Sequence, residues 1–207
     1  MPLLAIYALT VLEAYLLGAI PTGYLVARSN RNVDLLRLGS GRTGTTNVLR
    51  TMGWKAAAVV FLGDFGKGVL AVLVARVLSG GDPVVETVAA LAAIFGHTFS
   101  IYIGFKGGRG VATGVGGLAA IAPLAALVAA AIAFTTIGIS RYVSLGSILG
   151  ACSAPVTVAV LVFAAGESPV RLIYAFLGAL FVVVSHKDNI GRLLKGTERK
   201  LGEHVRA

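Results

Sequence analysis

Residues 39–50, with the sequence Gly-Ser-Gly-Arg-Thr-Gly-Thr-Thr-Asn-Val-Leu-Arg, form a polar, glycine-rich segment between two long apolar runs. Glycines let neighbouring backbone N–H groups converge on an anion. Hydroxyl, amide and guanidinium groups add donors that suit a phosphate; they belong to Ser40, Thr45, Thr46, Asn47, Arg42 and Arg50. We interpret this first glycine-rich segment as a phosphate-binding loop at the membrane surface, with a solvated linker as the alternative.

Three glycines of this segment, Gly39, Gly41 and Gly44, also satisfy the dinucleotide-binding pattern G-x-G-x-x-G. That pattern is informative only after a β-strand and within a βαβ unit. Here an apolar run and a polar linker precede it. We therefore reject the nucleotide interpretation.

The composition indicates an all-α membrane protein. The chain has 207 residues, of which 57% are hydrophobic and only 13% charged. At least five apolar stretches approach or exceed the roughly 20 residues that cross a bilayer as a helix. We expect a polytopic helix bundle that forms a single domain over residues 1–207. The formal charge of +9 lies mostly in short loops, so membrane topology explains it better than nucleic-acid binding does.

The cysteine content and the first apolar run limit the function further. Cys152 is the only cysteine, which excludes an intramolecular disulfide and a multi-cysteine metal site. No basic residue precedes the first apolar run and no small-residue cleavage pattern ends it, so we expect a retained helix rather than a signal peptide. We predict no metal site and no cofactor.

The apolar runs predict about seven helices, of which two are short and do not span. The full spans are expected at residues 3–27, 56–78, 84–105, 145–165 and 172–184. Residues 111–139 are apolar with Pro123 near the middle. We predict two helices of about 14 residues hinged there, each roughly 21 Å long and thus shorter than the bilayer core. This hairpin returns Arg141 to the basic side.

The basic residues predict the orientation. With the N-terminus outside, 15 of the 18 lysines and arginines fall on one side of the membrane, in residues 28–55, 106–109, 141 and 187–206. Cytoplasmic loops carry such an excess, so we expect the C-terminus to be cytoplasmic. Within the spans, Glu13 should face the bundle interior, and Asp64 and Lys67, three residues apart, form either a structural pair or part of a site. We interpret His97 as a packing residue.

The predicted topology brings four polar clusters to one face: residues 39–50, 106–110, 141–147 and 186–189. They combine glycine-rich loops, arginines, hydroxyls, an amide and a histidine. No carboxylate cluster suits a metal, and no Ser–His–Asp arrangement is visible. Such donors favour anions, and their number is sufficient for two phosphates.

These motifs resemble those of the bacterial membrane-integral glycerol-3-phosphate acyltransferases that use acyl phosphate as donor. The similarity rests on Gly-Ser-Gly-x-x-Gly-x-Thr-Asn-Val-Leu-Arg at 39–50, Phe-Lys-Gly-Gly-Arg-Gly-Val-Ala-Thr at 105–113, Arg-Tyr-Val-Ser-Leu-x-Ser at 141–147 and His-x-x-Asn-Ile-x-Arg-Leu-Leu-x-Gly-x-Glu at 186–198. Asp64 and Lys67-Gly68 match a further Asp-x-x-Lys-Gly element. The resemblance covers nearly the whole chain and implies a seven-helix bundle in the bacterial inner membrane with an active site at its cytoplasmic face.

The resemblance also implies roles for single residues. The catalytic set is His186, Ser147 and Arg109. Glycerol 3-phosphate would be bound by Arg50, Arg109, Ser147, His186 and Asn189, and acyl phosphate by Ser40, Gly41, Thr46, Asn47, Lys106, Gly107 and Gly108. Arg109 departs from the family, which usually has lysine there; arginine keeps the charge but not the geometry.

The implied reaction moves a fatty acyl group from acyl phosphate to glycerol 3-phosphate and gives lysophosphatidic acid. The N–H groups of Gly107 and Gly108 are candidate oxyanion or phosphate donors. Either His186 or the donor phosphate removes the hydroxyl proton, and the resemblance favours the phosphate. Besides its substrates and membrane lipid, the enzyme that makes acyl phosphate is a candidate partner. A transporter of an organic phosphate is the competing class, although transporters usually bind at the bilayer midplane between related halves.

Overall fold

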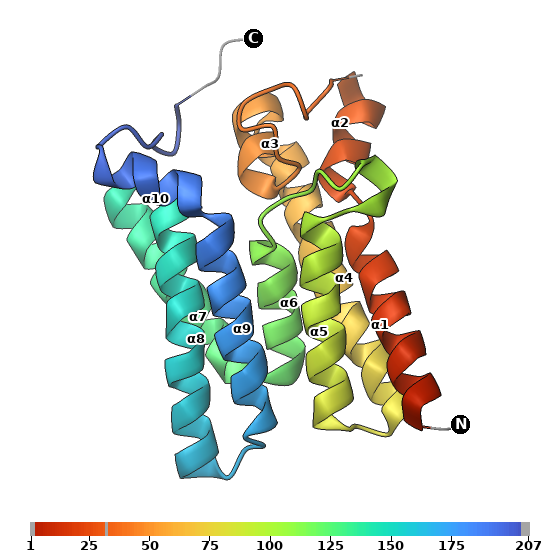
Figure 1. Ribbon diagram of the computed structural model, residues 1–207. Helices are drawn as coiled ribbons and strands as arrows, with labels where there is room; N and C mark the ends of the chain where they lie inside the picture. Colours follow the sequence, from red (N-terminus) through yellow and green to blue (C-terminus); the bar gives the residue numbers. More distant parts are fainter. Residues whose placement is uncertain (1–2, 32, 204–207) are drawn as a thin grey trace.

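The computed structural model describes residues 3–31 and 33–203 (Figure 1). Over these residues the chain forms ten α-helices and one short 3-10 helix. In chain order they are α1 (Leu3–Ala19), α2 (Thr22–Arg31), α3 (Thr45–Met52), α4 (Trp54–Ser79), α5 (Pro83–Thr98), η1 (Ile101–Ile103), α6 (Val111–Ile121), α7 (Pro123–Ser140), α8 (Val143–Ala165), α9 (Val170–Ser185) and α10 (Lys187–Leu194).

Helices α1 and α4 to α9 run along the bundle, whereas α2, α3 and α10 lie at one end (Figure 1). The all-α fold class is as the sequence predicted. Within the described residues, five segments are long and apolar enough to cross a membrane, and a sixth qualifies if α9 and α10 count as one span bent by 60°. Many large apolar side chains on the outside of the bundle are exposed, as expected of a surface that faces lipid.

Two prolines break apolar runs. The first run stops at Ala19 and resumes at Thr22, because Pro21 cannot continue the helical hydrogen bonding. The freed carbonyls find other donors: Ser100 Oγ bonds to the Ala19 oxygen at 2.5 Å, and Lys67 Nζ bonds to the Ile20 oxygen at 2.8 Å. Such replacement donors let a broken helix lie at membrane depth.

The second break confirms the hinge at Pro123 but not the predicted lengths. Helix α6 has 11 residues, and α7 has 18 and is long enough to span. The first helix begins at Val111 as predicted, but it is shorter than expected because Pro123 lies before the middle of the run and α6 ends at Ile121. The second is longer because no proline interrupts it before Arg141. Only one of the two predicted short helices is therefore short.

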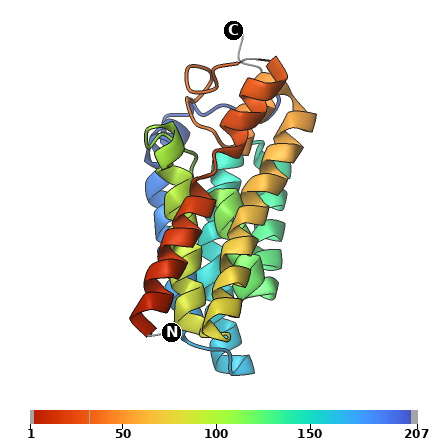
Figure 2. The same ribbon diagram turned by 90° about the vertical axis from the view of Figure 1, so that its right-hand side faces the viewer.

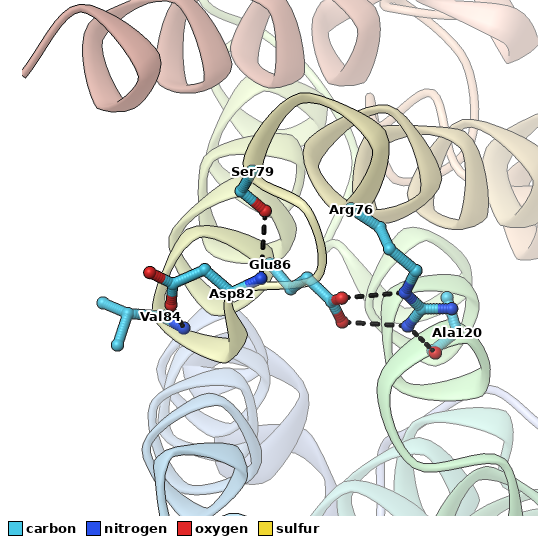
Figure 3. A network of polar contacts seen from close by, with 6 residues as sticks. All are labelled: Arg76, Ser79, Asp82, Val84, Glu86 and Ala120. Atoms are coloured by element: carbon cyan, nitrogen blue, oxygen red, sulfur yellow. Dashed lines mark hydrogen bonds and ion pairs between the residues drawn. The ribbon is translucent and has the colours of Figure 1, made fainter. Parts of the chain in front are cut away.

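A network at the end of α6 holds this break in place (Figure 3). Arg76 of α4 forms two hydrogen bonds to Glu86 of α5, from Nε at 2.7 Å and from Nη2 at 2.8 Å. The same Nη2 donates to the carbonyl oxygen of Ala120 at 2.8 Å. That carbonyl belongs to the last turn of α6, where helical carbonyls lack partners. Figure 3 also shows Asp82 capping α5 through the Val84 N–H.

Small residues let the helices approach closely. A side chain at Gly96 of α5 would collide with the backbone of Tyr15 in α1, and one at Gly68 of α4 with the backbone of Thr113 in α6. Gly146 and Gly150 of α8, which are four residues apart, likewise face the backbone of α7, and this spacing suits close helix contact in membranes. These contacts fix α6 beneath the polar end of the bundle.

The four polar clusters of the sequence meet at that end. The segment before α3, the loop before α6, the α7–α8 junction and α10 all lie there, and the N-terminal end of α1 lies at the other (Figures 1 and 2). The hairpin of α6 and α7 does return Arg141 to the side of the other clusters: its carbonyl oxygen accepts from the Leu201 N–H at 2.7 Å.

Candidate active site

Asn47 holds the first glycine-rich segment in shape. Its side-chain Nδ2 donates to the main-chain oxygens of Leu35 at 3.4 Å, Leu38 at 3.0 Å and Arg42 at 2.8 Å. Its Oδ1 accepts from the N–H of Ser40 at 3.0 Å. One buried amide thus joins the start of α3 to four points of the loop before it.

These contacts give Asn47 a structural task besides the predicted binding of acyl phosphate, which stays a prediction. An amide nitrogen carries two hydrogens, and the loop carbonyls use both. Gly39 shows how tight the fit is: its φ is +63°, and a side chain there would collide with the Asn47 amide oxygen. Asn47 shapes the loop and has no donor left for a phosphate.

The other predicted residues of this segment differ in what they offer. The N–H of Gly41 donates to the Leu38 oxygen at 3.0 Å, so it too serves the loop. Ser40 is exposed, and Thr46 is half-buried in the first turn of α3. Among the described residues, neither hydroxyl forms a hydrogen bond, so both remain candidate phosphate ligands.

Arg50 projects from the last turn of α3. Its Nη2 donates to the Arg199 carbonyl oxygen at 3.2 Å, and its buried Nε has no partner within the described part of the chain. Burial lowers the pKa of Arg50, although the Glu198 carboxylate acts in the opposite direction. Arginine is effectively always protonated, so α3 presents a charged and only partly paired guanidinium.

The second glycine-rich segment, residues 106–110, folds back on the end of α5. The Gly107 N–H donates to the Thr98 oxygen at 3.0 Å, and the Gly108 N–H donates to the His97 oxygen at 3.2 Å. Both N–H groups, which we predicted as oxyanion or phosphate donors, are thus already paired, and that role stays a prediction. A side chain at Gly108 would collide with the His97 ring, which agrees with a packing role for His97.

Arg109 is the only half-buried cation in this second segment. Its guanidinium makes no hydrogen bond to any described residue, and its Nε is buried. Burial lowers the pKa of Arg109 to about 10, and the positive charges of Arg42 and Arg192 lower it further, against the weaker effect of Glu198 and Asp188. At neutral pH the group is therefore a cation whose charge the protein does not neutralise.

The start of α6 follows directly after Arg109. The first N–H groups of a helix have no partner within it, and together with the helix dipole they attract an anion. Gly110, with φ +78°, turns the chain into this helix. We had assigned the backbone donors to Gly107 and Gly108, whereas the unpaired donors lie a few residues later. Lys106 is exposed.

Glu198 connects three side chains of the site. Its Oε1 accepts from Ser144 Oγ at 2.8 Å and Asn189 Nδ2 at 2.6 Å, and its Oε2 accepts from Arg192 Nε at 2.7 Å. Burial raises the pKa of Glu198, but these hydrogen bonds, first of all that from Asn189, outweigh burial and lower it overall. Sequence reasoning did not assign Glu198 to the site; its place at the end of the fourth motif was the only signal.

His186 and Ser147 complete the set. The Nδ1 of His186 lies 2.8 Å from the Val182 carbonyl oxygen. A carbonyl can only accept, so Nδ1 carries the hydrogen and the neutral ring presents a lone pair at Nε2. His186 is also within electrostatic range of Arg109 and Glu198. Ser147 Oγ donates to the Val143 oxygen at 2.9 Å, which leaves its lone pairs free to accept.

This arrangement brings together Arg50, Arg109, His186 and Asn189 around Glu198, with more positive than negative charge. Asn189 keeps a buried Oδ1 without a partner in the described part of the chain. Within residues 3–31 and 33–203 no three metal-binding side chains gather. The fold and the site define a multi-pass membrane protein with a cluster of cations and polar side chains at one end of its bundle.

Comparison with known proteins gives the family. The family model described as glycerol-3-phosphate acyltransferase matches residues 8–196. A glycerol-3-phosphate acyltransferase of Dehalococcoides mccartyi is 43% identical over 99% of this chain and 100% of its own length. That of Thermus thermophilus is 45% identical over 96% of both chains. The chain therefore belongs to the glycerol-3-phosphate acyltransferase family, of the integral-membrane PlsY type.

Two solved structures support the same conclusion. Crystal structures of the integral membrane glycerol 3-phosphate acyltransferase PlsY (YgiH), in a glycerol 3-phosphate form and a lysophosphatidic acid form, are 38% identical to this chain. Their TM-scores are 0.86 and 0.85; each covers 95% of this chain, and 96% and 95% of their own chains are matched. These relatives leave no support for the alternative of an organic-phosphate transporter.

Proposed function

We propose that this enzyme transfers a fatty acyl group from acyl phosphate to glycerol 3-phosphate at the cytoplasmic face of a bacterial inner membrane. The products are lysophosphatidic acid and inorganic phosphate. The observation that carries the proposal is Arg109, whose half-buried charge is repelled by Arg42 and Arg192 and hydrogen-bonded by no described residue. A doubly charged phosphate would supply what this charge lacks.

The second phosphate has a separate set of donors. Arg50 projects from α3, and Ser40 and Thr46 belong to the same segment. We assign glycerol 3-phosphate to Arg50, Arg109, Ser147, His186 and Asn189, and acyl phosphate to Ser40, Thr46, Lys106 and the free N–H groups that open α6. The solved relatives were crystallised in glycerol 3-phosphate and lysophosphatidic acid forms, which supports the acceptor and the product.

The chemistry needs no covalent enzyme intermediate, because acyl phosphate is a mixed anhydride that arrives activated. The glycerol oxygen attacks the acyl carbon, the bond from that carbon to the phosphate oxygen breaks, and phosphate departs with the electron pair. The hydroxyl proton passes to the phosphate. The protein holds the two substrates together, an effect that can supply up to about 7–11 kcal/mol of the barrier in ideal cases.

His186 would orient the attacking hydroxyl. Its Nδ1–H is used by the Val182 carbonyl, so its free Nε2 can accept a hydrogen bond from the glycerol hydroxyl. The phosphate of the donor remains the proposed base, since a dianion close to the hydroxyl can take the proton directly.

The direct test is to give the purified enzyme glycerol 3-phosphate with palmitoyl phosphate, and separately with palmitoyl-CoA or palmitoyl-acyl carrier protein. Lysophosphatidic acid should form with acyl phosphate only. Product formation with a thioester at the same rate would overturn the proposed donor, while the absence of product with every donor would overturn the proposed activity.

The cytoplasmic site is tested by labelling from one side of the membrane. Single cysteines at Arg42 and Asp82, in a Cys152→Ala background, lie at opposite ends of the bundle. An impermeant thiol reagent added to intact cells should label the cysteine at 82, and that at 42 only after lysis. The reverse pattern, or labelling of both from outside, would contradict the proposed orientation.

A further inference from the structure

The C-terminal tail, residues 195–203, joins two separate parts of the active-site end. It contains no helix. At one point it meets α3, where the Arg199 carbonyl accepts from Arg50 at 3.2 Å. At another it meets the α7–α8 junction, where Leu201 is bonded to Arg141. Between the end of α10 and these two contacts lies Glu198, whose carboxylate accepts hydrogen bonds from Ser144 and Asn189.

Arg141 grips Leu201 with both its backbone and its side chain. Its carbonyl oxygen accepts from the Leu201 N–H at 2.7 Å, and its Nη2 donates to the Leu201 carbonyl at 2.7 Å. The Lys200 ammonium, 5.7 Å from the ring centre, lies over the neighbouring Tyr142. The tail is thus docked on the junction by two consecutive residues.

The backbone of Arg141 suggests that this grip is a selected feature. Its φ is +62°, and it is one of two residues other than glycine with a positive φ among those described. Glycine adopts this conformation without strain, whereas other residues rarely occupy it and do so mainly where function requires. The hydrogen bond from the Arg141 side chain to Leu201 accounts for an arginine at a position where glycine would be less strained.

We propose that Arg141 is a positioning residue that docks the C-terminal tail and, through Glu198, fixes Asn189 and Arg192 for the acceptor phosphate. The inference rests on the proposed function. Glu198 lies three residues before Leu201 and accepts from both Asn189 and Arg192. If the tail leaves the junction, Glu198 loses the anchor that follows it, and Asn189 loses the carboxylate that orients its amide. Arg141 itself forms bonds to the tail rather than to the site.

The experiment combines proteolysis with kinetics on the full-length enzyme in detergent. In the variant Arg141→Gly, glycine adopts the positive φ without strain. The change removes only the side-chain hydrogen bond to Leu201 and keeps the backbone one. Trypsin should cleave it at Arg199 and Lys200 faster than it cleaves the wild type. Its KM for glycerol 3-phosphate should rise about tenfold, the effect of one charge-assisted hydrogen bond, with kcat changed by less than about twofold.

A second variant removes the other half of the grip. A chain that ends at Lys200 keeps Glu198 but lacks Leu201, so it should reproduce the rise in KM. Combining the truncation with Arg141→Gly should add nothing further, because both changes delete one interaction. The control is Lys195→Ala, which removes an exposed tail charge and should leave KM and cleavage at Arg199 as in the wild type.

Several results would overturn the inference. Equal cleavage of wild type and Arg141→Gly would show that Arg141 does not dock the tail. Faster cleavage without a change in KM would show that docking of the tail does not affect the site. Additive effects of Arg141→Gly and the truncation would show that Arg141 and Leu201 act independently. If the wild type makes no lysophosphatidic acid, the proposed function fails, while the cleavage rates still decide whether Arg141 docks the tail.

Discussion

Arg109 should contribute to catalysis at the expense of fold stability. The lowering of its pKa to about 10 means that the folded, empty site disfavours the charged form relative to the unfolded chain. The difference from the ordinary arginine value corresponds to roughly 3 kcal/mol against folding at neutral pH. The cause is first burial and then the positive charges of Arg42 and Arg192.

The change Arg109→Ala removes this unfavourable charge and also the burial of two methylene groups, each worth about 0.8 kcal/mol. The two effects oppose each other, so we expect the free energy of unfolding to rise by about 1–2 kcal/mol. Activity should respond differently. Loss of a charged partner of a buried phosphate costs about 2–5 kcal/mol, so kcat/KM should fall by about 30-fold to several thousandfold.

The measurement is thermal unfolding in detergent, with and without glycerol 3-phosphate, alongside steady-state kinetics. Ligand should raise the midpoint of the wild type more than that of Arg109→Ala, because only a bound ligand shifts it. Arg109→Lys should retain substantial activity, since it keeps the charge and the family usually has lysine here. Lys55→Ala, an exposed charge at the start of α4, is the control for general loss of positive charge.

Two results would refute this reasoning. If Arg109→Ala unfolds several kcal/mol more easily than wild type, the arginine is a structural residue whose charge is satisfied in the folded protein. If the variant keeps wild-type kcat/KM, the unneutralised charge is not the phosphate ligand, and the proposed function loses its main support.

Three further changes test other parts of the site. Asn47→Asp, which removes both amide donors of the loop, should lower the unfolding midpoint as well as activity; loss of activity with unchanged stability would restore Asn47 as a ligand. His186→Gln and His186→Asn should clearly exceed His186→Ala in kcat; equal loss in all three, together with loss of an acidic limb of the wild-type pH profile, would make His186 the base. The pKa of Glu198 is lowered in the folded protein, so the stability that its charged form contributes is complete above the ordinary value near 4.5 and is lost as the pH falls through the lower folded value. The unfolding midpoints of wild type and Glu198→Gln should therefore converge in acid. A difference between the two midpoints that stays constant down to that acidic pH would contradict this.

The broad plan of the fold could be read from the sequence because it depends on patterns that act locally. Apolar runs of sufficient length, a proline within one of them and the bias of basic residues together predicted the hinge at Pro123 and the return of Arg141 to the polar end. The length of α7 was wrong because the hinge was taken to divide the run evenly. The span predicted at 84–105 also proved too long: α5 ends at Thr98, because the segment that follows folds back on the end of that helix.

The site was predicted by residue type but not by hydrogen-bond partner. Arg109 and His186 could be singled out from their motifs. The hydrogen bonds of Asn47, Gly107 and Gly108 could not be predicted in this way. Each of these residues donates to a carbonyl oxygen of another segment, and only the fold brings that segment close. Glu198 shows the same limit: it sits in a tail without apolar periodicity, and only the folded structure brings it to Asn189.

The pairing of the cations distinguishes structural from functional charges in this bundle. Besides the exposed Lys55, helix α4 carries Lys67 and Arg76, and each of these two donates to a carbonyl freed at one of the two proline breaks. Each is also paired with a carboxylate, Lys67 with Asp64 at 2.9 Å and Arg76 with Glu86 at 2.7 Å. The sequence left Asp64 and Lys67 open between structure and site, and these bonds support structure. Buried charges need such partners, and Arg109 has none among the described residues, which supports the proposal that a substrate phosphate pairs with it.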